Sequence, residues 1–390
     1  MGKENLILET SDPLNTLVMS GNVEITQCKN IWSDLSFKYE IPNEEIRLID
    51  FNRSGVWLPN NEVKINYRAR FISSELEQKD NRTWFALPIR REGDTNFSAS
   101  DGYLRFRDDI FANISSIMLD TCDTNYQRGP NLLNLNSRSR GNCGGCTACV
   151  HNYKDLYDKT VLKDQKKLVS KQEISDFFDQ KEQDGVNIST LKQIAVVTGL
   201  FGSESAVVEH MKLIDSVVKP KGFKGELMYF GCEVNSETAL EELTALGNFS
   251  LIYAIDNFTK RKEILTKSKS LINIDTAKNT LSLAKKKGIE TTFAYIAGID
   301  SISEMKTGFE ILKDSITRFP IINIYQIQTI GQLSAMDIEA KKLEYYIKSR
   351  KLIEKIFEGT DLTPKRWENY RPLWYKTFRD KPLPNNAFGD

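Results

Sequence analysis

Residues 275–296 read DTAKNTLSLAKKKGIETTFAYI and hold one complete helix followed by one strand. Asp275 is the predicted N-cap and Gly288 the predicted C-terminal cap, and the apolar residues between them recur at helical spacing. The run that follows, 291–296, is short, apolar and rich in β-branched and aromatic residues, as buried strands are. A helix and a strand in this order predict a right-handed parallel β/α unit.

The same unit repeats along most of the chain. Short apolar runs alternate with amphipathic segments, and together they predict six strands, at residues 132–135, 193–197, 226–230, 250–254, 291–296 and 321–326. Six parallel strands predict an α/β fold in the form of an open, partial (β/α)6 TIM-like barrel over residues 126–335. Residues 336–390 are predicted to be a C-terminal helical extension that becomes aromatic and basic at 366–376.

Residues 1–125 have a different pattern and are predicted to be a β-rich accessory module. Two alternating runs within 56–72 flank Asn60-Asn61, which indicates a hairpin, and 84–89 and 103–106 read as further strands. We expect this module to pack on the barrel as a cap. Residues 154–185 are polar with helical spacing and are predicted to be a helix with a solvated face.

Composition excludes several classes of protein. The chain of 390 residues has 53 Lys and Arg against 53 Asp and Glu, so no overall positive charge favours nucleic acid or an anionic membrane. No run approaches the 18 apolar residues of a membrane span, and residues 1–9 lack the apolar core of a signal peptide. We therefore expect a cytoplasmic protein without membrane attachment, for which nucleic acid is a possible but not a favoured partner.

Three of the six cysteines, Cys143, Cys146 and Cys149, lie in a Gly-rich loop just after the first predicted barrel strand. Their crowding in a long chain indicates metal ligands rather than a disulfide scaffold. Three thiolates suit a 4Fe–4S cluster with one open iron, to which a substrate or cofactor can bind. The alternative is a structural zinc site completed by Cys122 or His151.

A three-cysteine loop after the first strand of a partial β/α barrel resembles the radical S-adenosylmethionine (SAM) enzymes. Residues 130–335 most resemble the biotin synthase and aminofutalosine synthase type of barrel. The chain departs from the usual CxxxCxxC spacing of that family, because it reads CxxCxxC and has Ala148 where the family has an aromatic residue before the last cysteine. Such a departure bears on how SAM is held more than on the cluster itself.

The resemblance implies a set of SAM-binding residues at the ends of the strands. Gly202, Ser203 and Glu204 stand where the family holds the SAM amino group, although Glu204 also suits the first turn of a helix. Asp256 and Asn257 stand where the ribose hydroxyls bind, or else cap the next helix. The remaining implied residues contact adenine and are Ala294, Ile296, Gly298, Tyr325 and Gln326, the last two through their backbones. Arg138 and Arg140, beside the cysteine loop, could pair with the SAM carboxylate or with a substrate anion.

The resemblance also implies the reaction. Such an enzyme cleaves SAM reductively at its 4Fe–4S cluster to give a 5′-deoxyadenosyl radical, which abstracts hydrogen from a small-molecule or peptide substrate, and it needs an electron donor such as flavodoxin or ferredoxin. Cys232 follows the third strand and could return a hydrogen atom to a product radical, or be an inert buried thiol. Two alternatives stay open, namely a β/α barrel with a zinc site and a radical SAM enzyme that modifies tRNA or a peptide through its N-terminal module and residues 366–376.

Overall fold

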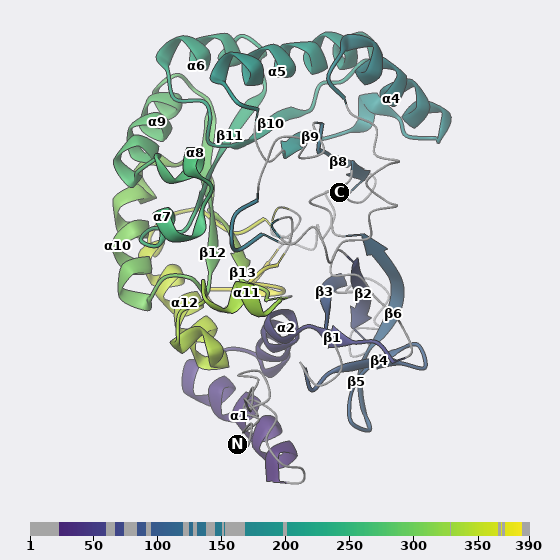
Figure 1. The fold of residues 1–390 in the computed structure, drawn as a ribbon, viewed down its shortest axis with the longest axis vertical. Coiled ribbons are helices and arrows are strands. Elements are labelled where there is room, and N and C mark those ends of the chain that lie inside the picture. The colour runs from purple at the N-terminus through teal and green to yellow at the C-terminus, as the bar shows by residue number, and fades with distance from the viewer. Residues whose placement is uncertain are drawn as a thin grey trace, which may run out of the picture.

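The computed structural model describes residues 23–59, 67–73, 84–90, 95–119, 125–127, 131–137, 145–149, 152, 168–197, 201–327, 329–365, 368 and 371–383. Two sheets dominate this part of the chain, a small closed β-barrel near the N-terminus and a parallel half-barrel after it (Figure 1). Residues 138–144, which include Cys143, Arg138 and Arg140, lie outside the described residues, as do Cys122 and His151.

The half-barrel confirms the predicted fold class, because all six predicted strands are present and parallel. Its strand order is β13-β12-β11-β10-β9-β8-β7, and the short β7 adds an antiparallel edge to β8. The bounds are β7 (Tyr126–Gln127), β8 (Leu132–Leu135), β9 (Gln193–Val197), β10 (Glu226–Gly231), β11 (Phe249–Asp256), β12 (Glu290–Ala297) and β13 (Ile321–Ile324).

Helices follow the strands and cover the outer face of the half-barrel (Figure 1). The helices of this part are α4 (Lys171–Gln183), α5 (Glu204–Val218), α6 (Glu237–Thr244), α7 (Arg261–Ile264), α8 (Lys267–Ser270), α9 (Ile274–Lys286), α10 (Ile302–Leu312), α11 (Ile330–Leu333) and α12 (Leu343–Ile356). Short 3-10 turns lie at η5 (Ile188–Thr190), η6 (Lys219–Lys221), η7 (Lys313–Ser315) and η8 (Glu339–Lys341).

Two predicted helix boundaries differ from the structure. The N-cap of α9 is Asn273, whose side chain accepts from the Thr276 N–H over 2.8 Å, so the predicted N-cap Asp275 lies inside the first turn as an acid near the positive end of the helix. The polar segment predicted as a helix over 154–185 contains α4, and residues 153–167 lie outside the described residues.

Side chains on the two faces of the half-barrel belong to separate apolar clusters. Alternate residues of the strands point inward, where Ala195, Met228, Ile252, Ala294 and Ile321 form a small cluster of their own. The residues between them pack against the helices in the main core. Val197 and Phe230, nearest the C-terminal strand ends, pack against this cluster and are only half-buried.

The N-terminal module begins with two helices that the sequence pattern did not predict, α1 (Val23–Tyr39) and α2 (Asn43–Ser54). Six strands then close into a barrel in the order β1-β3-β2-β6-β5-β4. Their bounds are β1 (Val56–Trp57), β2 (Tyr67–Ser73), β3 (Trp84–Arg90), β4 (Ser98–Ser100), β5 (Tyr103–Phe106) and β6 (Asp109–Leu119). The predicted hairpin within 56–72 is wrong, because β1 pairs in parallel with β3 and β4 and not with β2.

Aromatic side chains fill the interface between the helices and the small barrel. Phe51 of α2 contacts Phe97 edge-on, with ring centroids 4.9 Å apart, and Trp32 of α1 contacts Phe111 at 5.8 Å. The Trp32 Nε1–H donates to Asp50 over 2.7 Å, so its polar end is satisfied within the buried layer. The helices are therefore part of the module's core.

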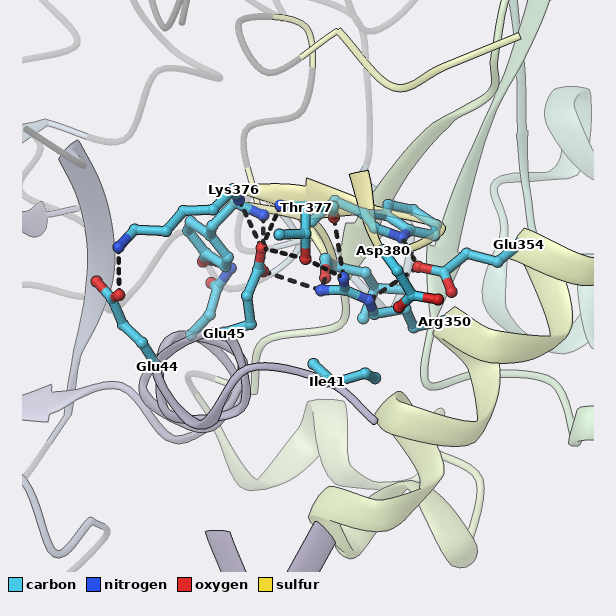
Figure 2. A network of polar contacts seen from close by, with 12 residues as sticks. Ile41, Glu44, Glu45, Arg350, Glu354, Lys376, Thr377 and Asp380 are labelled. Carbon is cyan, nitrogen blue, oxygen red and sulfur yellow. Dashed lines mark hydrogen bonds and ion pairs between the residues drawn. The ribbon is translucent and has the colours of Figure 1, made fainter. Parts of the chain in front are cut away.

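The chain end is held by a buried ion network that joins α2 to α12 (Figure 2). The fully buried Glu45 carboxylate accepts from the backbone N–H groups of residues 375–377 over 2.6–3.0 Å and from Arg350 over 2.9 Å. Arg350 also donates to Glu354 over 3.0 Å. The segment fixed in this way contains the short strands β14 (Thr377–Phe378) and β15 (Lys381–Pro382).

This arrangement bears on the predicted aromatic and basic docking surface at 366–376. Trp374 is 1% exposed and packs edge-on against Phe319 with centroids 5.3 Å apart, and Tyr375 is 3% exposed. Both rings are thus core residues, which leaves neither of them able to stack on a base. Within the described residues, no helix is long and apolar enough to cross a membrane.

Candidate functional site

The cysteine loop lies against the connection that follows β11. The Thr147 N–H donates to the Ile264 carbonyl over 2.7 Å, and the Gln332 side chain donates to the Ala148 carbonyl over 3.1 Å. Within the loop, the Cys149 N–H donates to the Cys146 carbonyl over 2.8 Å, which folds residues 146–149 into a turn. These contacts place the loop at the C-terminal ends of the strands, where parallel β/α barrels have their active sites.

Cys146 lies in a mixed apolar and polar environment. Burial raises the pKa of its thiol, and the nearby Lys269 ammonium opposes that effect. The Thr266 N–H points at Cys146 Sγ over 3.4 Å. Backbone N–H groups directed at sulfur are suited to a thiolate, and hydrogen bonds to sulfur are one of the ways in which proteins adjust iron–sulfur clusters.

Gly202, Ser203 and Glu204 form the turn between β9 and α5. Gly202 has φ +91°, a conformation that favours glycine, and Ser203 is the N-cap whose hydroxyl accepts from the Ala206 N–H over 3.2 Å. Oε1 of Glu204 accepts from the backbone N–H groups of Ser236 (2.7 Å) and Asn235 at the start of α6. Burial raises the pKa of Glu204, but these hydrogen bonds outweigh it and leave the pKa below its usual value.

The predicted role of Glu204 in holding the SAM amino group stays a prediction. Its two backbone contacts both use Oε1, which leaves Oε2 as the oxygen that could face an ammonium group. The alternative, that Glu204 is an acid in the first turn of a helix, is also correct, since Glu204 is the first residue of α5. The two roles are compatible because they use different oxygens of one carboxylate.

Asp256 ends β11 in an unusual backbone conformation. Its φ is +65°, and the register with β12 shifts between Ala254 and Asp256. The carboxylate pairs with Lys269 Nζ at 2.6 Å. Burial alone would lower the pKa of Lys269, but Asp256, Cys146 and Cys232 together raise this pKa above its usual value. The side chain is therefore protonated and positively charged.

Lys269 was not predicted from the sequence, where it appears only as one member of a lysine-rich run. Arg261 explains how the run folds back to bring it to Asp256. Its guanidinium donates to the carbonyls of Asn257 (2.9 Å), Lys269 (2.9 Å) and Ile272 (2.7 Å), and so ties both ends of the segment together. No local sequence pattern indicates such a long-range clamp.

Asn257 is fully buried, and neither its Nδ2 nor its Oδ1 has a hydrogen-bond partner in the described part of the chain. Burying a polar group without a partner costs about 1–3 kcal/mol, so such a side chain in a native protein needs an explanation. A ligand with hydroxyl groups would satisfy both amide atoms. The residue therefore fits the ribose contact that was predicted for it, as an acceptor and donor that the fold itself does not use.

The ends of β12 and β13 meet beneath the cysteine loop. Ala294 and Ile296 lie on the inner face of the half-barrel, and Ile296 joins Tyr325, Cys146 and Ala148 in one apolar cluster. Gly298 has φ +123°, and a Cβ there would lie 2.8 Å from the Tyr325 Cβ. The fold therefore requires glycine at this point of the strand end.

Tyr325 and Gln326, which were predicted to contact adenine through their backbones, both form hydrogen bonds within the protein. The Tyr325 N–H donates to the Ala297 carbonyl over 2.7 Å, and its hydroxyl donates to the Gln332 carbonyl over 2.7 Å. The Gln326 side chain reaches α2, where its Nε2 donates to the Asn52 carbonyl over 2.7 Å. Gln326 therefore links the half-barrel to the N-terminal module, and its backbone contact with adenine stays a prediction.

Cys232 lies just beyond β10 and is 3% exposed. Burial, opposed by Lys269 and supported by Glu233, raises the pKa of its thiol to about 12. Glu233, which was not predicted, accepts from the N–H groups of Cys232 and Phe201 over 3.0 Å each and from the Tyr229 hydroxyl. Cys232 is therefore held as a neutral S–H at the same end of the barrel as the cysteine loop.

These residues fit the predicted cofactors. Cys146 and Cys149 offer soft thiolates on a glycine-supported turn, and the unpartnered amide of Asn257 and the left-handed Gly202 and Gly298 lie at neighbouring strand ends. The described residues contain no group of three His, Cys, Asp or Glu that could hold a metal by itself, and Cys143, the third predicted ligand, lies outside them. Arg138 and Arg140 also lie outside them, so their role stays a prediction.

Comparisons with known proteins give low similarity only. No protein-family model and no curated protein matches the chain. Among solved structures it is similar to Streptococcus suis SuiB bound to S-adenosylmethionine (9% identity, TM-score 0.38), Kitasatospora setae TsrM with cobalamin and a 4Fe–4S cluster (11%, 0.34) and Escherichia coli coproporphyrinogen III oxidase HemN (14%, 0.37). TsrM and HemN are radical SAM enzymes. The matches span 56%, 51% and 60% of this chain, and 46%, 34% and 56% of those chains.

Proposed function

We propose that the protein is a radical SAM enzyme whose 4Fe–4S cluster is held by Cys143, Cys146 and Cys149. The observation that carries the proposal is the position of the turn at residues 146–149. It packs on the connection that follows β11 through Thr147 and Ile264, on the same side of the half-barrel as Asn257, whose buried amide has no protein partner in the described residues. A soft-ligand loop beside an unused polar group at the C-terminal strand ends suits a cluster with an adjacent nucleoside ligand.

Within this proposal each residue has a distinct task in holding SAM. Glu204 Oε2 would accept from the amino group, Asn257 and Asp256 would meet the ribose hydroxyls, and Ile296 would pack against adenine. Arg138 and Arg140 are the proposed partners of the carboxylate. With cluster and SAM bound, the cofactors would supply reductive carbon–sulfur cleavage to a 5′-deoxyadenosyl radical.

The chain's own residues would surround the reacting atoms and supply a hydrogen atom. The inner wall of Val197, Phe230 and Ile252 is apolar and offers no acidic or basic group to the reacting atoms. The neutral thiol of Cys232 is the proposed hydrogen-atom donor to a product radical. We propose a small molecule or peptide as substrate, a flavodoxin or ferredoxin as electron donor, a cytoplasmic location in which the thiols stay reduced, and the biotin synthase type as the subfamily.

Anaerobic reconstitution tests the proposal. After incubation with iron and sulfide, the protein should be brown and hold about four iron atoms per chain. Adding dithionite and SAM should then release 5′-deoxyadenosine and methionine. A colourless protein that binds zinc with high affinity and forms no 5′-deoxyadenosine would instead identify the alternative, a barrel with a structural zinc site.

A further inference from the structure

The connection between β11 and α9 carries an unusual concentration of positive charge. Residues 259–271 contain Lys260, Arg261, Lys262, Lys267 and Lys269 against a single acid, Glu263, in a chain with no net charge overall. Two of these cations are used internally, since Arg261 binds backbone carbonyls and Lys269 pairs with Asp256. The structure thus separates a buried, structural pair of cations from the others.

Lys262 and Lys267 carry two of the three remaining charges at the surface, and Lys260 is half-buried. Both surface lysines are exposed, and neither forms an ion pair with any residue that the structure describes. Leu271, the residue after α8, is 76% exposed and is among the most exposed large apolar side chains of the described chain. These residues place two unpaired positive charges and one apolar side chain on the same exposed connection.

The same connection is the part of the barrel that touches the cysteine loop. Lys262 lies two residues before Ile264, whose carbonyl accepts from Thr147, and Lys267 directly follows Thr266, whose N–H points at Cys146 Sγ. The Arg261 clamp fixes the path of this segment, so the exposed residues lie on a rigid connection that contacts the loop. A molecule bound to Lys262, Lys267 and Leu271 would therefore lie beside the segment that contacts Cys146 and Thr147.

We propose that Lys262, Lys267 and Leu271 form the docking patch for an acidic one-electron carrier protein. The proposal rests on the proposed function, which requires one electron to reach the cluster for each SAM cleaved. Electron transfer weakens steeply with distance, so the carrier must dock where the cluster lies nearest the surface. Opposite charges would speed the encounter, and Leu271 would give the short-lived complex its apolar contact. Electron-carrier encounters bury little surface, so these residues would form the charged centre of a small interface.

Flavodoxin, a small acidic flavoprotein, is the probe for the test. Binding of oxidised flavodoxin to the reconstituted protein is measured by titration calorimetry for the parent, for Lys262→Glu/Lys267→Glu and for a control, Lys224→Glu/Lys286→Glu. The control residues are exposed, lack ion-pair partners in the described chain and precede β10 and β12 at the opposite end of the barrel. We expect the patch variant to bind about tenfold more weakly and the control to stay within about twofold of the parent.

Two further measurements complete the test. Parent binding should weaken with added salt, because screening sets in over about 10 Å at 0.1 M, and Leu271→Ala should weaken binding without changing that salt dependence. Formation of 5′-deoxyadenosine driven by dithionite should be unchanged in the patch variant, because a small reductant needs no docking, whereas formation driven by reduced flavodoxin should fall.

The outcomes separate the two proposals. Equal binding by the patch variant and the parent, or equal losses in the patch and control variants, would overturn the docking patch. So would loss of dithionite-driven substrate turnover with flavodoxin binding intact, since the patch would then serve the substrate. Patch-dependent flavodoxin binding by a parent that never cleaves SAM would instead keep the docking surface and reject the proposed reaction.

Discussion

Lys269 Nζ lies 2.6 Å from the Asp256 carboxylate, at the point where β11 ends in a left-handed residue. The side chains are 17% and 16% exposed, so the pair is largely withdrawn from water. Lys269 is also electrostatically coupled to Cys146 and Cys232, one from the cysteine loop and one from the end of β10. A single ammonium therefore links the three elements of the candidate site.

Removing this ammonium should destabilise the protein. Lys269→Met leaves the Asp256 carboxylate poorly solvated and unpaired, and we expect a loss of about 2–3 kcal/mol, below the range for a fully buried pair. Lys269→Met/Asp256→Asn should recover most of the loss, because asparagine tolerates the left-handed backbone and carries no charge. Urea unfolding measures both, with exposed Lys267→Met as a control expected to stay within about 0.5 kcal/mol of the parent. No recovery in the double variant would show that the lysine acts by packing.

The three loop cysteines should each be required for the cluster. Cys143→Ala, Cys146→Ala and Cys149→Ala should each fall from about four iron atoms per chain to fewer than about one after reconstitution, because a cube that lacks a ligand is labile. Cys232→Ala is the matched control and should retain full iron, since Cys232 belongs to the main core and Cys146 to a separate apolar cluster. Iron analysis checks this result. Full iron in all three loop variants would reject the ligand assignment.

The half-barrel could be predicted from the sequence because each of its strands and helices has a local sequence pattern. Each strand is a continuous apolar run and each helix has its own periodicity, so Gln193–Val197 and Glu290–Ala297 were recognisable without their neighbours. The cysteine loop was recognisable because three thiols at fixed spacing already specify soft-metal chemistry. The predicted N-cap of α9 was wrong by two residues, because Asn273 and Asp275 are both good capping residues.

What could not be predicted depends on contacts between distant residues. β1 enters the small barrel by parallel pairing with β3, whereas two adjacent alternating runs favour an antiparallel hairpin. Gln326 donates to Asn52 across 274 residues of sequence, and the Arg261 clamp that delivers Lys269 to Asp256 binds carbonyls, which any sequence provides. Such sites are set by tertiary packing and leave no periodic signal.

Glu204 should affect SAM binding more than iron content. Glu204→Gln keeps an oxygen for the Ser236 and Asn235 N–H groups but removes the charge that we propose binds the SAM ammonium, so we expect about tenfold weaker SAM binding with unchanged iron. Equilibrium binding of SAM measures the change, and Glu209→Gln, exposed on the same helix, is the control. Unchanged affinity would confine Glu204 to its contacts with α6.

The depressed pKa of Glu204 adds a pH dependence to stability. Because the carboxylate is favoured in the folded state, its contribution is present above its usual pKa of 4.5 and is lost as pH falls through the lower folded value. The stability difference between the parent and Glu204→Gln should therefore shrink on acidification below about pH 4.5. Urea unfolding at a series of pH values checks the sign, and a difference that grows with acidity would contradict it.

Arg350 should be essential to the chain end. Arg350→Met leaves the fully buried Glu45 without its cation and removes donors to Glu354 and Thr377, so we expect a loss of about 3–5 kcal/mol and exposure of the segment after residue 371. Urea unfolding and limited proteolysis measure these effects. Lys348→Met, half-exposed on the same helix, is the control, and equal losses in both variants would show that the network adds nothing specific.

The burial of Cys232 favours the neutral form of its thiol, and this predicts how the residue reacts. Burial raises its pKa from 9.0 to about 12, so the folded protein favours the S–H form, and the stability this provides is present below pH 9 and is lost as pH rises towards 12. Iodoacetamide requires a thiolate, so Cys232 should resist alkylation at pH 8 in the folded protein and react when urea unfolds it. Peptide mass analysis reads out this residue alone, and rapid labelling of the folded protein would contradict the assigned burial.

The same neutral thiol is the form from which a hydrogen atom can be taken. If Cys232 returns hydrogen to a product radical, Cys232→Ala and Cys232→Ser should both still form 5′-deoxyadenosine but divert the product, because alanine has no such hydrogen and a serine O–H bond is too strong to give one up. Serine also preserves the side-chain volume, which separates lost chemistry from a packing defect of about 1 kcal/mol. Product analysis under single-turnover conditions decides the matter, and a normal product from both variants would leave Cys232 as a core residue supported by Glu233.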